Sequence, residues 1–216
     1  MLEVIFQKLS STVGVLQQGG MTIIPLLICS VVSLAVSIER FIYLKKAKGD
    51  NFKLIKQVKL MIKKGDINEA KSIVQGESGP VAGMLMEGFK YYGERKAELR
   101  KYLEIIGQNQ IKTLEKRLRV LDFIATVSPL LGLLGTVVGI IDSFNILAGA
   151  QGLATPGTLS VGISEALIST AVGLIVAIPT MLMYTYLVSV VEERTEEMNR
   201  WSVDIIEILS VGGSNV

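Results

Sequence analysis

The sequence predicts an all-α membrane protein with three transmembrane helices, of which long helices 2 and 3 extend into a cytoplasmic helical region. Half of the 216 residues are hydrophobic, and the mean hydropathy is +0.48. Only 19% of the residues are charged, whereas soluble domains carry about 25%. The charged residues are also absent from three long stretches, and such stretches are typical of helices that cross a bilayer.

Three segments match the roughly 20 apolar residues that a helix needs to cross the hydrocarbon layer. The first predicted span covers residues 20–44, and its uncharged part ends before Glu39, which we expect near the water interface with Arg40. The second covers residues 123–145 and the third covers residues 159–191. The uncharged part of the third runs from Ala166 to Val191, so this helix must tilt or continue beyond the bilayer.

The remaining segments are predicted to be helical or to connect helices. Apolar residues at helical spacing near the start indicate an amphipathic helix on the membrane surface, and the non-basic start argues against a signal peptide. The stripe of leucines and isoleucines between Glu94 and Asp122 predicts one helix that continues into the second span. The predicted segments outside the spans are a periplasmic-side amphipathic helix (1–18), a cytoplasmic helical region (45–122), a periplasmic loop (146–158) and a cytoplasmic helical tail (192–216).

The distribution of basic residues predicts the orientation of the chain. Of the 22 Lys and Arg residues, 21 lie between Glu39 and Asp122 or after Val191, and the loop between the second and third spans has none. Basic residues collect on the cytoplasmic side of a membrane. We therefore expect a periplasmic N-terminus and a cytoplasmic C-terminus in the inner membrane.

The composition excludes several classes of site. The chain has no His, and its single Cys, Cys29, lies in an apolar stretch, so a His/Cys metal site, an internal disulfide and Cys–His catalysis are ruled out. Acidic and basic residues alternate along the chain, so no nucleic-acid-binding surface is indicated. The spans contain no nucleophile–base pair and no paired carboxylates. We expect neither an enzyme nor a bound cofactor.

The second span carries glycines at helix-packing spacing. Gly132, Gly135 and Gly139 let helix backbones approach closely, and Pro129 removes a backbone donor and can bend the helix. These features fit a packing face as well as a functional one. Thr136 is equally ambiguous, because a membrane threonine often hydrogen-bonds to its own helix.

The third span carries a carboxylate near a smooth face. If Thr155 caps a helix that starts at Pro156, Glu165 lies more than two turns inside that helix, and a carboxylate in the bilayer is a candidate for function. In the alternative interpretation, Glu165 only ends the apolar stretch and lies in the water of the headgroup region. Ser169, Gly173 and Ala177 follow at steps of four, and Pro179 adds a second possible kink. Thr170 lies about 140° from Glu165 on an ideal helix, so the two residues border one lumen only loosely.

Two stretches resemble a known family. Residues 128–140, SPLLGLLGTVVGI, resemble the second-span motif of the MotA/TolQ/ExbB proton channel family. Residues 162–174, GISEALISTAVGL, followed by Ala177-Ile178-Pro179, resemble its third-span motif. With three predicted spans, the chain resembles the ExbB and TolQ branches of the family, whereas proteins of the flagellar MotA branch have four spans.

The resemblance implies a subunit that converts proton motive force into mechanical work on the envelope, with protons as the transported ion. It implies a ring of five copies around two helices of a small ExbD-like or TolR-like partner, whose membrane aspartate binds and releases protons. A TonB-like or TolA-like protein is a further implied partner. Thr136 and Thr170 match the family's pore-lining threonines, and Glu165 matches its third-span glutamate.

Two other classes remain open. A passive membrane scaffold that assembles a signalling or transport complex would also carry glycine-rich packing faces. A small-molecule transporter would show inverted repeats and broken helices, and three spans without a visible repeat argue against it.

Overall fold

The computed structural model describes residues 21–149 and 156–210. The predicted amphipathic helix at 1–18 and the predicted capping residue Thr155 lie outside the described residues. The chain divides into two compact units: Met1–Ser37 with Arg119–Tyr184, and Ile38–Leu118 with Thr185–Val216.

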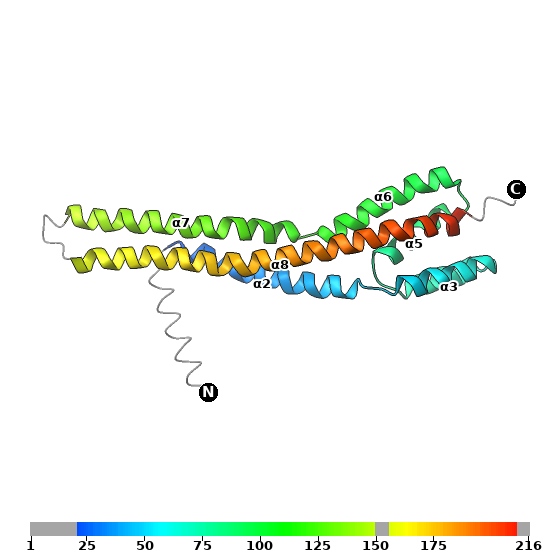
Figure 1. Ribbon diagram of the computed structural model, residues 1–216, viewed down its shortest axis with the longest axis horizontal. Helices are drawn as coiled ribbons and strands as arrows, with labels where there is room; N and C mark the ends of the chain where they lie inside the picture. Colours follow the sequence, from blue (N-terminus) through cyan, green and yellow to red (C-terminus); the bar gives the residue numbers. More distant parts are fainter. Residues whose placement is uncertain (1–20, 150–155, 211–216) are drawn as a thin grey trace, which may run out of the picture. The chain divides into compact units, whose positions relative to one another are not determined.

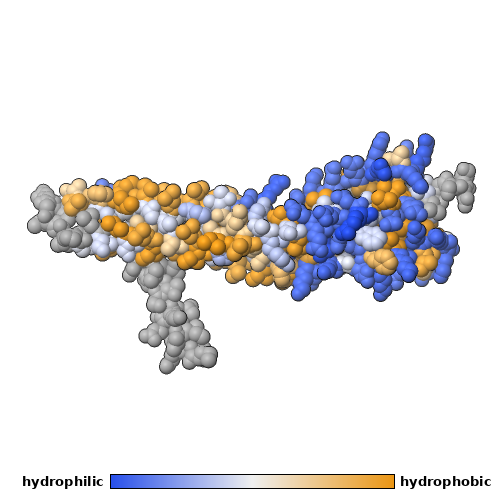
Figure 2. All heavy atoms as spheres, in the orientation of Figure 1, coloured by the Kyte–Doolittle hydropathy of each residue, from blue (hydrophilic) through white to orange (hydrophobic). Residues whose placement is uncertain are grey.

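The first unit is built from three helices, α2 (Ile23–Lys46), α7 (Leu118–Gly149) and α8 (Pro156–Ser210), each of which contributes only part of its length (Figure 1). Only six residues separate α7 from α8, so the two helices run antiparallel. Large hydrophobic side chains remain exposed around this unit, among them Leu133, Leu167 and Leu174. Figure 2 shows hydrophobic residues over its visible face. A helix that is apolar on all sides belongs in a large core or a bilayer.

Each of these three helices is long and apolar enough to cross a membrane. The predicted all-α membrane fold with three transmembrane helices is therefore confirmed, and the third helix is the longest at 55 residues. Helical backbone extends beyond the predicted limits of the second and third spans, because α7 continues to Gly149 and α8 starts at Pro156.

The second unit contains the five described helices that do not reach into the first unit. They are α3 (Asn51–Lys63), α4 (Ile67–Gln75), α5 (Pro80–Gly88), the 3₁₀ helix η1 (Phe89–Tyr91) and α6 (Lys96–Glu115). Aspartate side chains start α3 and α4, because Asp50 and Asp66 accept hydrogen bonds from the third backbone N–H that follows each. Hydrophilic residues dominate the visible surface of this unit (Figure 2).

The C-terminal part of α8 organises the second unit. Helix α3 runs parallel to it, with a hydrogen bond from Asn51 to Glu197 and an ion pair of 3.3 Å between Lys59 and Glu207. Leucine and isoleucine side chains of α5, α6 and α8 are fully buried, as expected for the core of a soluble domain. The fully buried examples are Leu85, Leu99, Ile205, Ile208 and Leu209.

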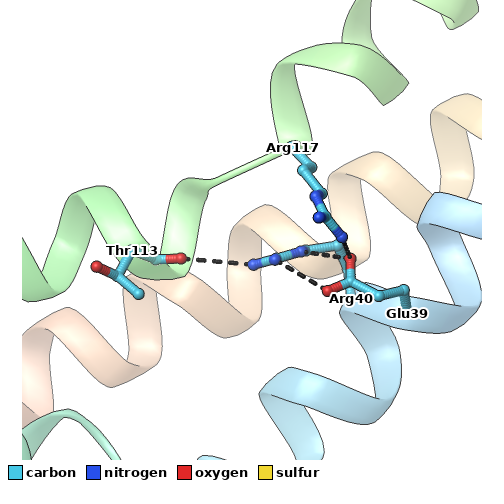
Figure 3. A network of polar contacts seen from close by, with 4 residues as sticks. All are labelled: Glu39, Arg40, Thr113 and Arg117. Atoms are coloured by element: carbon cyan, nitrogen blue, oxygen red, sulfur yellow. Dashed lines mark hydrogen bonds and ion pairs between the residues drawn. The ribbon is translucent and has the colours of Figure 1, made fainter.

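The prediction of one continuous helix from Glu94 into the second span is wrong. Helix α6 ends at Glu115 and α7 begins at Leu118, with Arg117 at a φ of 69°. This left-handed backbone is costly for a residue with a Cβ. Two contacts from α2 stabilise this break (Figure 3). Glu39 Oε2 forms an ion pair with Arg117 Nη1 at 3.1 Å, and Arg40 Nη1 donates a hydrogen bond of 3.4 Å to the Thr113 carbonyl.

Candidate functional site

Small residues line the contact between α7 and α8 in the first unit. We call this contact the small-residue seam. On α7 it comprises Ser128, Gly132, Gly135, Gly139 and Ser143, and on α8 it comprises Gly162, Ala166, Ser169, Thr170 and Gly173. These residues recur at steps of three and four, which places them on one face of each helix. All four glycines predicted to pack lie on it, with Ser169, whereas Ala177 is buried four residues beyond Gly173.

The two backbones approach so closely that the glycines have no room for a side chain. A Cβ on Gly132 would lie 3.0 Å from the Thr170 Cα, and a Cβ on Gly173 would lie 2.7 Å from the Ser128 carbonyl oxygen. A Cβ on Gly135 would overlap the Ser169 hydroxyl. Close backbone approach of this kind holds membrane helices together by dispersion, because lipid provides no hydrophobic driving force.

Hydroxyl groups form hydrogen bonds between the helices within this apolar contact. Thr170 Oγ1 donates a hydrogen bond of 3.0 Å to the Gly132 carbonyl on α7. Ser169 is 1% exposed and shares a hydrogen bond of 2.6 Å with Thr22, directly before α2. The sequence analysis missed Thr22, because nothing in the pattern of the first span marks its partner 147 residues away. The 3–4 spacing could have indicated Ser143 and Gly162.

Thr136 lies beside the seam and not within it. The side chain is partly exposed and its hydroxyl donates to the Leu133 carbonyl of its own helix at 2.6 Å. Its own helix therefore satisfies the donor, as the sequence analysis allowed. The lone pairs of the oxygen remain able to accept a hydrogen bond from water or a ligand.

Thr136 and Thr170 lie on the same side of the α7–α8 pair. At about 100° per residue, each threonine is roughly 60° from the centre of its helix's seam, and the antiparallel arrangement turns both toward one side. Thr22 meets Ser169 and Gly135, which lie toward the opposite side, so the start of α2 lies there. The threonine side carries exposed residues such as Leu133 and Leu174 and is left open by α2.

Glu165 lies on the other side of the seam. It is roughly 80° from the seam centre in the direction opposite to Thr170. The carboxylate is partly exposed, and no hydrogen bond or ion pair joins it to another described residue. The structure thus brings the two predicted threonines to one side and does not bring Glu165 to them within one chain. Pro129 and Pro179 both lie inside continuous helices, α7 and α8.

The fold and the seam define a multi-pass, all-helical membrane protein in which hydroxyl groups interrupt tightly packed apolar helices. The model of the MotA/TolQ/ExbB proton channel family matches residues 77–200, which include most of both seam helices. The chain therefore belongs to the MotA/TolQ/ExbB proton channel family.

Named relatives agree with the ExbB and TolQ side of this family. The putative biopolymer transport protein ExbB-like 3 of Synechocystis is 33% identical, over 76% of this chain and 79% of the relative. The putative ExbB homologue of Methanothermobacter thermautotrophicus is 26% identical over 99% of this chain and 77% of its own length. The Tol-Pal system protein TolQ of Haemophilus influenzae is 45% identical over 39% of this chain and 37% of its own length.

Proposed function

We propose that this protein is the ring-forming, proton-conducting subunit of an inner-membrane complex that converts proton motive force into mechanical work on the envelope. In this proposal about five copies surround the transmembrane helices of a small ExbD-like or TolR-like partner, and a TonB-like or TolA-like protein transmits the motion. Membership of the proton channel family supports the class of function. The observation that carries the proposal is the common side of Thr136 and Thr170, which α2 leaves open.

The chemistry of hydroxyl groups explains why threonines suit such a lumen. A carboxylate of the partner is costly to ionise in a low-dielectric channel unless it is hydrogen-bonded. A threonine both donates and accepts, so rings of Thr136 and Thr170 can hold water and solvate that carboxylate without adding a fixed charge. Each proton that crosses supplies about 2.3 kcal/mol per 100 mV. Alternating protonation of the partner then drives a stepwise movement against the ring.

The test is proton uptake by vesicles that contain the full-length chain and its partner, under an imposed potential. Thr136→Val and Thr170→Val are expected to lower the rate about tenfold or more, since valine keeps the volume but neither donates nor accepts. Thr170→Ser keeps the donor and should retain most of the activity. Thr180→Val is the matched control, because Thr180 is buried and its hydroxyl donates to the Val176 carbonyl of its own helix.

Two outcomes would contradict the proposal. Wild-type uptake in both valine variants would remove the threonines from the pathway. An assembled wild-type complex without potential-driven uptake would instead favour a passive membrane scaffold. Glu165→Ala belongs in the same series: the resemblance predicts loss of uptake with normal assembly, although Glu165 lies away from the threonine side.

A further inference from the structure

The second unit contains a pocket between the end of α2 and the middle of α8 that plays no part in the proposed proton pathway. Its volume is about 390 Å³, and ligand pockets typically measure about 300–1,000 Å³. Its apolar wall includes Leu44 and Leu187, which are 2% and 0% exposed, and the partly open rings of Phe41 and Tyr186. The two rings contact each other with centroids 6.2 Å apart.

The other end of the pocket is positively charged. Lys45 on α2 and Lys48, two residues beyond the end of α2, are exposed, and Arg194 on α8 is 4% exposed. Among the described residues that line the pocket, the only carboxylate is Glu193, whose Oε1 is 3.9 Å from Arg194 Nη1. Three positive groups face one negative group, so the lining favours an anion.

Arg194 is a buried cation whose hydrogen-bond donors are only partly used. Its Nη1 forms an ion pair of 2.8 Å with Glu197, but Glu197 also accepts a hydrogen bond from Asn51. The buried Nε of Arg194 has no hydrogen-bond partner among the described residues. A buried cation whose donors are only partly used gains from a further negative charge nearby.

The polarity of the pocket follows the direction of the helices. Along both α2 and α8 the residue numbers rise from the apolar span toward the charged region. The aromatic end, at Phe41 and Tyr186, therefore faces the hydrocarbon layer, and the end at Lys48 and Arg194 faces water. A phospholipid in the adjacent leaflet has the same order, with its acyl chains toward the bilayer centre and its phosphate at the surface.

We propose that this pocket binds an anionic phospholipid, with its phosphate beside Lys45, Lys48 and Arg194 and the start of an acyl chain against the partly open rings of Phe41 and Tyr186. A basic pocket beside a membrane-spanning helix on the side rich in Lys and Arg suits such a headgroup. The apolar wall distinguishes a lipid from a free phosphate ion, which would leave that wall uncovered. Because the lipid contacts both α2 and α8, it would fix their contact at the membrane surface.

The experiment uses the full-length protein, purified in a mild detergent and stripped of lipid. Native mass spectrometry measures binding of palmitoyl-oleoyl phosphatidylglycerol and of palmitoyl-oleoyl phosphatidylcholine. We expect phosphatidylglycerol to bind about tenfold more tightly or better, and the Lys45→Gln/Lys48→Gln double variant to lose most of this preference. Inorganic phosphate at equal concentration should not displace the lipid.

The matched control is the Lys46→Gln/Lys53→Gln double variant. It removes the same charge from exposed positions that do not line the pocket, and its lipid affinity should stay within about twofold of the wild type. Equal binding of the two lipids, displacement by inorganic phosphate, or an equal loss in the control would each overturn the proposal. Loss of assembly without loss of lipid binding in the Lys45/Lys48 variant would assign the pocket to a second copy of the chain. Gel filtration and circular dichroism verify that every variant is folded.

Discussion

The hydroxyl group of Thr170 can form two contacts, one through its proton and one through its oxygen. Its proton is donated to the Gly132 carbonyl, so the donor serves the contact between α8 and α7. The oxygen keeps its lone pairs and lies on the side of the helix pair that α2 leaves open. A residue of this kind packs the subunit and still offers an acceptor to a lumen.

Substitution of single glycines tests how closely α7 and α8 pack along the seam. Gly173→Ala should destabilise the protein by about 1–3 kcal/mol, because its Cβ would lie 2.7 Å from a backbone oxygen that cannot move alone. Gly149→Ala is the control, since no atom of the described residues lies within 4 Å of a Cβ at that position of α7. Thermal unfolding in detergent, followed by gel filtration of the remaining native protein, measures both. Equal midpoints for the two variants would argue against the tight seam.

At the scale of elements, the break between α6 and α7 separates a hydrophilic helix from an apolar one. The left-handed backbone of Arg117 turns the chain there, and its side chain reaches Glu39 on α2. That ion pair is partly exposed, at 51% and 39% for the two side chains, so it contributes little by itself. The more constrained link is Arg40, which is 4% exposed and donates both to Glu39 and to the Thr113 carbonyl.

Substitutions at Arg117 separate backbone strain from the ion pair. Glycine adopts a positive φ without a Cβ clash, so Arg117→Gly should be about 1 kcal/mol more stable than Arg117→Ala, although both lack the guanidinium. Thermal unfolding of the two variants against the wild type measures the difference. If alanine proves at least as stable as glycine, the backbone at this position is not left-handed in the folded protein.

The whole molecule joins two units of opposite surface chemistry through three helices. In one unit, leucine and isoleucine side chains face outward, and in the other they are buried under lysines and glutamates. A bilayer can accommodate the first surface and water the second. The basic residues of the second unit then predict which side of the membrane it occupies.

Site-directed labelling tests this topology in intact cells. In a background with Cys29→Ser, a cysteine at Ala148 should react with a membrane-impermeant maleimide added outside the inner membrane. A cysteine at Glu77 should react only after the cells are permeabilised. Both positions are exposed. The reverse pattern would invert the proposed orientation of the chain in the membrane.

Several features of the protein could be predicted from the sequence because they depend on local composition. Uncharged stretches identified the three membrane helices, and the 3–4 spacing of small residues placed Gly132, Gly135 and Gly139 on one face. The break at Lys116–Arg117 could not be predicted in this way, since neither residue is a glycine or proline. The side of the seam on which Glu165 lies also depends on how α7 and α8 pack.

The sequence by itself determined the class of the protein, because the transfer of charged side chains into lipid is so costly that their distribution restricts the possible topologies. Only the tertiary structure decided which hydroxyl groups meet across helices, which side of the α7–α8 pair stays open, and where Arg194 is enclosed. These features arise from contacts between residues far apart in the chain, such as Thr22 with Ser169 and Gly132 with Thr170. Helical periodicity defines the faces of each helix, but packing chooses which faces come together.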